Sequence, residues 1–398
     1  MTARRWIVNH PLTTLAVAAS ALVAVACSDN TGNPPTQPEA TSTSKVYTAE
    51  QFEATAKPRF TTDGGATPFR TSKTIPYWSS TFTDPTNGVT YPYTMVGTNA
   101  FSSTSTSTIP TVIIPFRFVF ASAPANGSVM DGAQDVAATI ASPIFTNYTY
   151  PLSGGDVAQY GDAIQRAQFN RIGSTYHVNL GGPTVLPTQN IDVPANQGFT
   201  FRNSRGDLVG LMDIAWFSNR LHQAINDLHV PATALPLILV HNTFMYAVDP
   251  SVYCCVIGYH GATASRNGNG DQQVQTYMFG AFVTPRTFGG WPGVGLSDIH
   301  GISHEVSEWM DDPFVNNAVN PWLTPTAPQY GCTGLMETGD PVVGYWFPLP
   351  GNPQANANGV WHPEDEVYFS WFARQTPSIA YNGLYTYMGT FTSPATGC

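Results

Sequence analysis

A short stretch of the chain, residues 300–308, holds residue types that can bind and use a metal ion. Its core is His304-Glu305-x-x-Glu308, and His300 stands four residues before His304. At about 100° per residue, an α-helix would place His300, His304 and Glu308 within roughly 80° on one face. Side chains one turn apart can ligate one metal, and a Glu beside the first ligand can act as a base on water. We therefore expect His304 and Glu308 to bind a metal, His300 to be available as an extra nitrogen ligand, and Glu305 to be the general base.

Glutamate is scarce in this chain, which distinguishes the motif from an ordinary amphipathic surface helix. No Glu occurs between Glu53 and Glu305, and then two lie within one helical turn beside His304. A chance match is roughly a 1% event, although a search for many motifs raises that figure. The metal site is therefore favoured, and a solvated polar helix face is the alternative.

A metal on this helix needs a third protein ligand from elsewhere in the chain. Glu337 is the next Glu after the helix and lies in the turn sequence METGDP. We predict that Glu337 is this ligand and that Asp340 is the second candidate. The alternative is that Asp340 and Pro341 only form a turn.

Other histidines and acidic residues carry weaker signals. His241 follows an apolar run and His260 lies in the sequence GYHG, so either could bind substrate or stabilise an oxyanion. A buried, hydrogen-bonded histidine is the commoner role for each. The acidic residues 364–366 could be glycosidase carboxylates, but adjacent carboxylates in a Pro-led loop more often form a solvated turn.

The composition excludes several classes of partner. Charged residues make up 11% of the chain, the net charge is −10, and Lys occurs only at Lys45, Lys57 and Lys73. Nucleic acid needs a basic surface and a Walker loop needs a Lys, so we expect neither nucleic acid nor a nucleotide as partner. Abundant Gly, Pro, Ser and Thr with 12% aromatic residues are typical of a loop-rich, β-rich extracytoplasmic protein. A carbohydrate-active protein is a further possibility that rests on composition alone.

Apolar spacing predicts the elements that position these residues. In the metal-binding helix, five apolar residues from Ile299 to Met310 form a stripe of roughly 100° that would be buried, away from the ligands. Within residues 47–155, Pro110 and Pro115 should mark strand edges or bulges, and the Ser/Thr-rich segment 102–108 should be a hairpin tip. The predicted elements are strands over 91–96 and 109–120, a helix over 156–169, a helix capped by Asp213 and closed by Pro231, strands over 234–240 and 276–284, and a helix over 297–310.

The first residues have the layout of a secretory signal. Arg4 and Arg5 precede the apolar segment 12–26, which is too short for a comfortable membrane span. Cys27 ends the sequence AVAC, which resembles a bacterial lipobox. This resemblance implies that Cys27 carries a lipid. The alternative is an ordinary signal peptide that is cleaved off. Residues 28–46, rich in Ser, Thr and Pro, predict a flexible linker. We expect a lipid-anchored protein of the cell envelope, at the outer surface or the periplasmic face, or else a secreted one.

Four further cysteines should form disulfide bonds in an oxidising compartment, and three pairings are possible. These are Cys254, Cys255, Cys332 and Cys398. A bond between the adjacent Cys254 and Cys255 would be strained, so we expect each of them to pair with Cys332 or Cys398. A cysteine metal site is the alternative, but no C-x-x-C spacing is present.

Two family resemblances follow from these motifs. The order of helix, two strands, His-Glu helix and downstream acidic ligand resembles the zincin metallopeptidases, which implies Zn²⁺ and peptidase activity. The sequences SHEVSE, DP, PTAP and ETGD are similar to the Exordium (phosphate-induced protein) family and its bacterial secreted relatives over about residues 235–398. That family implies an extracellular role without a settled activity. Glu308 stands where peptidases usually have a second His, and this harder ligand makes Ca²⁺ or Mn²⁺ more competitive with Zn²⁺.

These inferences combine into one hypothesis for the chain. We expect an α+β protein with a signal peptide (1–27), a linker (28–46), a β-rich region (47–155) and a zincin-like domain (156–398) of helix, mixed sheet and His-Glu-x-x-Glu helix. The expected function is a cell-surface, metal-dependent endopeptidase or related hydrolase that acts on an extracellular polypeptide. His260 or His241 would polarise the scissile carbonyl. The alternative is a non-catalytic extracellular binding or matrix protein with a structural or degenerate metal site.

Overall fold

The computed structural model describes residues 47–398 except 69–71, 126, 267–268, 289–295 and 352–358. Residues Val46–Cys398 form one compact unit. The predicted signal peptide, the predicted lipidation at Cys27 and the predicted linker lie outside the described residues. Among the helices that are described, none is long and apolar enough to cross a membrane.

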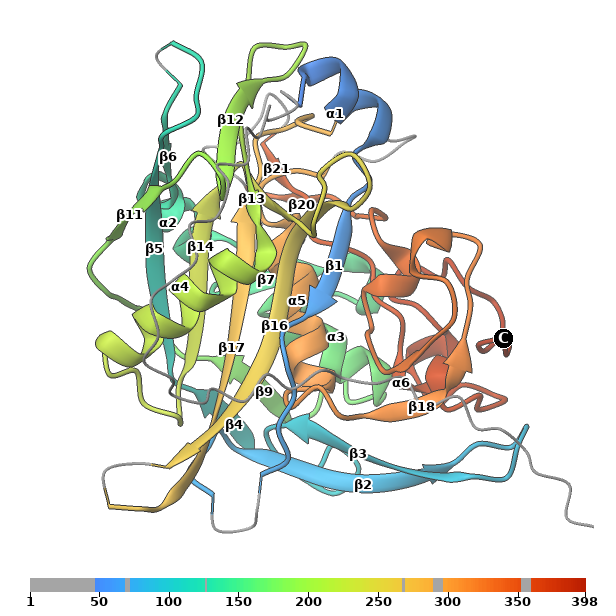
Figure 1. Ribbon diagram of the computed structural model, residues 1–398. Helices are drawn as coiled ribbons and strands as arrows, with labels where there is room; N and C mark the ends of the chain where they lie inside the picture. Colours follow the sequence, from blue (N-terminus) through green and yellow to red (C-terminus); the bar gives the residue numbers. More distant parts are fainter. Residues whose placement is uncertain (1–46, 69–71, 126, 267–268, 289–295, 352–358) are drawn as a thin grey trace, which may run out of the picture. The chain divides into compact units, whose positions relative to one another are not determined.

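In the described part of the chain, one curled, mixed sheet of eleven strands organises the fold, which belongs to the α+β class (Figure 1). Its main path runs β10-β5-β14-β17-β16-β15-β13-β12, while β1 adds to β16, and β6 and β11 add to β5. Strands β5, β14 and β17 are parallel neighbours, whereas β16 is antiparallel to β17. The strands are β1 (Arg59–Thr62), β5 (Thr111–Phe120), β6 (Val129–Asp131), β10 (Thr184–Val185), β11 (Gln189–Val193), β12 (Gly198–Arg202), β13 (Leu208–Asp213), β14 (Leu235–His241), β15 (Thr243–Tyr246), β16 (Cys254–Arg266) and β17 (Gln272–Phe282).

Apolar side chains cover both faces of this sheet and form two cores. In β14, Leu235, Leu237 and Leu239 belong to one core. Ile238 and Val240 of the same strand belong to the other core. Because both faces of β14 are buried, its residues form a continuous apolar run rather than an alternating pattern. The strand predicted over 234–240 is confirmed.

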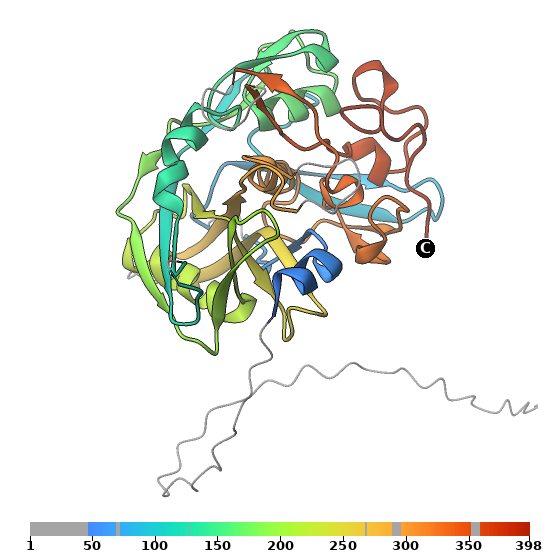
Figure 2. The same cartoon turned by 90° about the horizontal axis from the view of Figure 1, so that it is seen from above.

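Helices pack on both faces of the sheet. On one face lies α4 (Ile214–Asp227), whose Phe217 ring contacts the rings of Tyr259 and Phe279. On the other face, α5 (His300–Asp311) contacts β16 and β17, and α3 (Tyr160–Gln168) packs against α5. Figure 2 shows α5, in orange, between the strands and the red C-terminal segments. The other helices are α1 (Ala49–Thr55), α2 (Val136–Ala141) and α6 (Phe369–Phe372).

The N-terminal β-structure and the later strands share this one sheet. Strand β5 lies between β10 and β14, and β1 pairs with β16. The predicted boundary between residues 155 and 156 therefore does not divide two sheets. Five two-stranded pairs surround the main sheet: β2 (Tyr77–Thr83) with β3 (Thr90–Val96), β4 (Thr106–Ile109) with β9 (His177–Leu180), β7 (Tyr148–Tyr150) with β8 (Asp156–Ala158), β18 (Ala318–Trp322) with β19 (Thr333–Leu335), and β20 (Leu349–Pro350) with β21 (Val360–Trp361).

Proline positions explain how the apolar run 109–120 is divided. Pro110 separates β4 from β5, which pair with different strands. For Pro115 we predicted an edge or a bulge, and it lies within the inner strand β5, so the edge position is wrong. Pairing with β10 ends at Ile113 and pairing with β11 begins at Phe116, so Pro115 stands where one partner strand replaces the next.

Two other local predictions are wrong in their bounds. The segment 102–108 is not simply a hairpin tip, because Thr106 begins β4 and pairs with β9. The helix predicted over 156–169 begins only at Tyr160, since the preceding residues form β8. Strand β4 pairs with the distant β9, and β8 forms a hairpin with the nearby β7 (Tyr148–Tyr150).

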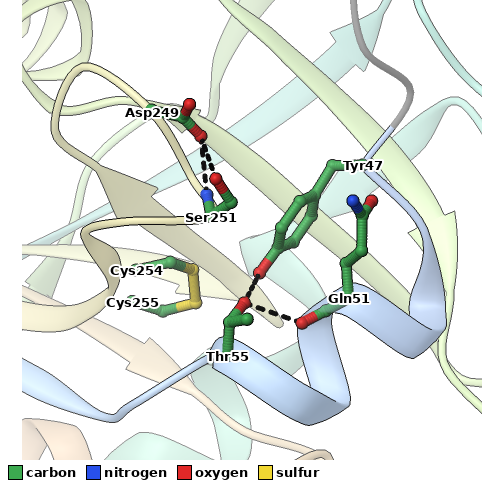
Figure 3. Close-up of a disulfide and its surroundings, with 7 residues drawn as sticks. All are labelled: Tyr47, Gln51, Thr55, Asp249, Ser251, Cys254 and Cys255. Atoms are coloured by element: carbon green, nitrogen blue, oxygen red, sulfur yellow. Dashed lines mark hydrogen bonds between the residues drawn. A yellow bond between two sulfur atoms is a disulfide. The ribbon is translucent and has the colours of Figure 1, made fainter.

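Two disulfide bonds are present, and their pairing differs from our prediction. Cys254 bonds to its neighbour Cys255 at the start of β16 (Figure 3), and Cys332 bonds to Cys398. A β-bridge joins the C-terminal segment to Trp322 of β18, which pairs with β19 directly after Cys332. This bridge brings Cys398 close to Cys332. The prediction that Cys254 and Cys255 each bond to Cys332 or Cys398 is therefore wrong.

Candidate metal centre

Helix α5, which carries the predicted metal motif, is buried on all sides. Gly258 of β16 and Gly280 of β17 are paired, and they let the helix lie directly on the sheet. A Cβ atom at Gly258 would lie 2.7 Å from Glu305 Cγ, and one at Gly280 would lie 2.8 Å from Ile302 Cγ1. The polar face that we expected to point away from the core therefore faces polar groups from other segments.

Acidic side chains fix both ends of α5. Before the helix, Asp298 Oδ2 lies 2.7 Å from His362 Nδ1, which ties the helix start to a later loop. After the helix, Asp312 Oδ1 accepts the backbone N–H groups of Asn316 and Asn317 at 2.9 and 3.1 Å. These bonds tie the two ends of α5 to the loops beside it.

The first group of possible metal ligands consists of His304, Glu308 and Asp340 (donor group 1). One donor atom of each lies within 4.8 Å of the others. His304 Nε2 is 3.1 Å from Glu308 Oε2 and 3.7 Å from Asp340 Oδ1. Phe60 of β1 stacks on the His304 ring, with the centroids 3.5 Å apart. Asp340, which we predicted as the second candidate for the third ligand, therefore lies beside His304, where we expected Glu337.

The turn that follows Glu337 holds the Glu308 carboxylate. Glu308 Oε1 accepts the backbone N–H groups of Gly339 and Asp340 at 3.1 and 3.2 Å, which leaves Oε2 to face His304. A Cβ atom at Gly339 would lie 2.2 Å from His304 Nδ1. The turn therefore requires glycine at this position and supplies backbone donors as well as a possible ligand.

Glu308 also belongs to a second group, with His260 and Glu337 (donor group 2). His260 Nδ1 is 3.8 Å from Glu308 Oε2, and His260 Nε2 is 3.9 Å from Glu337 Oε2. His260 Nδ1 also lies 3.2 Å from Glu305 Oε2. The predicted base and the predicted third ligand are therefore both neighbours of His260.

Glu364 orients the imidazole of His304. Its Oε2 lies 2.6 Å from His304 Nδ1, and its Oε1 accepts the backbone N–H of Gly344 at 2.8 Å. An N–H at Nδ1 leaves the lone pair of Nε2 facing Glu308 and Asp340, as a metal ligand requires. His300 Nε2 lies 3.3 Å from Glu364 Oε1, so His300 stands behind this carboxylate and belongs to neither donor group.

Sequence reasoning misses Glu364, because it interprets 364–366 as a solvated turn. All three side chains are buried. Glu366 Oε1 accepts the hydroxyl of Tyr160 at 2.8 Å, and Asp365 Oδ2 accepts that of Thr390 at 2.6 Å. The signal that could have found them is the apolar, aromatic run VYFSWF directly after them, which is unusual beside an exposed turn.

His241, which we had considered as a catalytic residue, lies in a different place. It ends β14, and its Nδ1 is 2.8 Å from Asp135 Oδ2. It belongs to neither donor group. The structure thus brings His260 to the metal motif and leaves His241 paired with an aspartate.

The carboxyl groups of this cluster are strongly perturbed. Burial raises the pKa of Glu337 and Asp340 well above their usual values, and the Glu308 carboxylate raises both further. Burial also raises the pKa of Glu305, against the lowering effect of His304. Burial would raise the pKa of Glu308 as well, but His304 outweighs it and lowers this pKa. A cation bound here would favour the ionised form of each carboxylate.

The two histidines of the cluster are shifted in opposite directions. Burial lowers the pKa of His260 to about 4. Burial would also lower the pKa of His304, but the carboxylates of Glu308 and Glu364 outweigh it and raise this pKa well above the usual value. His260 is therefore neutral near pH 7, which is the form that can ligate a metal.

Several buried donor atoms here have no hydrogen-bond partner among the described residues. They are His304 Nε2, Asp340 Oδ1, Glu305 Oε1 and both carboxylate oxygens of Glu337. Buried polar atoms without partners are costly, by about 1–3 kcal/mol each. A divalent cation would satisfy them, and this mixture of imidazole and carboxylate donors suits Zn²⁺ or Mn²⁺ better than Ca²⁺, which prefers oxygen ligands.

The chain was compared with protein-family models, with curated proteins and with solved structures, and nothing matched. The resemblances to zincin peptidases and to the Exordium family therefore stay predictions. The functional conclusion rests on the buried donor groups and their neighbours.

Proposed function

We propose that the protein is a metal-dependent hydrolase in which His304, Glu308 and Asp340 hold a divalent cation. The observation that carries this proposal is the convergence of buried donor atoms without partners on one point beside α5. Glu364 supports the same assignment, because its bond to His304 Nδ1 directs the Nε2 lone pair toward that point. A zincin-like arrangement of helix and sheet is part of the proposal.

The reaction would use Glu305 as general base. A divalent cation at donor group 1 would supply Lewis acidity, since it polarises a carbonyl and lowers the pKa of water. Glu305 Oε1 has no hydrogen-bond partner among the described residues, while Oε2 lies 3.2 Å from His260 Nδ1. Glu305 Oε1 would then take a proton from the attacking water.

We assign the substrate class as a polypeptide, on the basis of the His-Glu-x-x-Glu motif. Asp340 and Glu337 are the most exposed members of the two donor groups, with 9% and 5% of their side chains exposed. Substrate would therefore approach over the turn that contains both residues. A location in the cell envelope, with a lipid on Cys27, completes the proposal.

Metal content and proteolysis test this function together. The purified chain, free of any affinity tag, should contain a divalent metal, and it should cleave an unstructured polypeptide such as casein. Glu305→Gln should keep the metal and lose hydrolysis by about 10²-fold or more, because general-base catalysis contributes that much. Glu53→Gln, the same chemical change on an exposed residue, is the control. Equal hydrolysis by wild type and Glu305→Gln would remove Glu305 from the reaction.

A structural metal in a non-catalytic binding or matrix protein is the second candidate. The complete burial of His304 and Glu305 favours it, because a catalytic metal keeps an open position for water and substrate. In that case the metal would raise the free energy of unfolding, but the loaded protein would not cleave casein. The Glu305→Gln variant would then match wild type in every measurement except stability.

A further inference from the structure

One oxygen of Glu308 faces both donor groups. Glu308 Oε2 is 3.1 Å from His304 Nε2 and 3.8 Å from His260 Nδ1. The other oxygen, Oε1, is held by two backbone N–H groups of the turn at 339–340. Because the two backbone N–H groups hold Oε1, the Glu308 carboxylate can contact both His304 and His260 only through Oε2.

His260 presents a lone pair to this oxygen. His260 Nε2 lies 3.2 Å from the carbonyl oxygen of Asp312, which can only accept, so Nε2 carries the proton. Nδ1 therefore has the lone pair, yet it faces Glu305 Oε2 at 3.2 Å and Glu308 Oε2 at 3.8 Å. A lone pair that faces two carboxylate oxygens needs a proton or a cation between them.

Glu337 gives a second, independent indication of a ligand. Its side chain is buried, with 5% exposed, and neither carboxylate oxygen has a hydrogen-bond partner among the described residues. One of its oxygens lies within 4.8 Å of donor atoms of both His260 and Glu308. A carboxylate that is buried without a partner should be neutralised by something that the polypeptide does not supply.

The cluster contains more carboxylates than one ion at donor group 1 would use. Four carboxylates meet here, from Glu305, Glu308, Glu337 and Asp340. Within the described residues, no Lys or Arg forms an ion pair with any of them. One divalent cation at donor group 1 would take donor atoms of Glu308 and Asp340 and would leave both oxygens of Glu337 without a partner.

We propose that Glu308 bridges two divalent cations, the first held with His304 and Asp340 and the second held with His260 and Glu337. This inference rests on the proposed function and extends it, because the second ion occupies donor group 2. Hydrolases with two metals about 3.5–4 Å apart use both ions to stabilise the attacking and leaving oxygens. A shared carboxylate oxygen is compatible with that separation.

Metal stoichiometry tests this proposal directly. The full-length chain, tag-free and stripped with a chelator, is titrated with Zn²⁺, and native mass spectrometry counts the bound ions. Wild type should bind two ions, while Glu337→Gln and Asp340→Asn should each bind one. His241→Ala, which removes a histidine that pairs with an aspartate outside both groups, should still bind two. His260→Asn provides a second variant of donor group 2 and should also bind one.

A spectroscopic measurement distinguishes a bridged pair from two separate sites. Electron paramagnetic resonance of the wild type with two equivalents of Mn²⁺ should show a spin-coupled spectrum, whereas Glu337→Gln should show the pattern of isolated Mn²⁺. One bound ion in the wild type, or two in both donor-group-2 variants, would overturn the second site. If one ion binds and casein is cleaved, the proposed function stands without the second site. If no ion binds, both proposals fail.

Discussion

The bond between Glu364 and His304 offers a quantitative test of the metal centre. Both side chains are fully buried, and Glu364 Oε2 lies 2.6 Å from His304 Nδ1. Glu364→Gln keeps the shape and one accepting oxygen, but it removes the negative charge that favours a proton on Nδ1. Loss of such a partner lowers metal affinity by about 10- to 100-fold, which equals about 1.4–2.8 kcal/mol of binding free energy.

The assay is a calorimetric titration of the metal-free chain with Zn²⁺ in the presence of a competing chelator. Glu366→Gln is the matched control, because Glu366 is also buried but bonds to Tyr160 and belongs to neither donor group. It should bind Zn²⁺ as wild type does. Glu364→Leu, which also removes the accepting oxygen, should lose more affinity than Glu364→Gln. Equal Zn²⁺ affinity in wild type and Glu364→Gln would refute the role of Glu364 in orienting His304.

Three further predictions concern packing, pH and a buried ion pair. Gly339→Ala should lower the free energy of unfolding by about 1–3 kcal/mol in urea denaturation, because its Cβ would displace the His304 ring. Gly182→Ala, with open space around its Cβ, should not. Burial raises the pKa of Asp311 to about 7, from about 3.9 in an unfolded chain, so its protonated form stabilises the fold at low pH and this contribution is lost as pH rises through 7. Most of this loss falls between the two pKa values, so thermal melts of the metal-free chain should show a falling melting temperature from about pH 5 to about pH 7; a constant or rising value over that range would contradict this. Arg374→Met should cost about 3–5 kcal/mol in urea denaturation, because it leaves the carboxylate of Asp84, 2.9 Å from Arg374 Nη1, buried without a cationic partner; a loss below 1 kcal/mol would count against that account.

The elements that could be predicted from the sequence are those with a strong local pattern. The helix capped by Asp213 begins as predicted, because the Asp213 side chain accepts the N–H of Trp216. The helix of the metal motif and the strand ending near His241 also follow from apolar spacing. In each case the signal lies within one element, so neighbouring residues suffice to determine it.

The rest depends on contacts between distant segments, which no local pattern encodes. The spacing of the motif indicates His304 and Glu308, but it cannot decide whether Glu337 or Asp340 reaches His304, because both lie in the same turn. Glu364 reaches His304 only because the loop that contains it folds beside α5. The disulfide pairing likewise depends on a β-bridge to the C-terminal segment.

The bond between Cys332 and Cys398 closes a covalent ring that contains the non-helical residues of the proposed metal centre. Glu337, Asp340 and Glu364 all lie within this ring, in segments that have little regular secondary structure. A reductant that opens the ring would leave α5 anchored to the sheet but would allow these three carboxylates to separate from it. Amide hydrogen exchange should then accelerate in residues 333–397 before it accelerates in β14 or β17, so retention of the cation would depend on an oxidising environment.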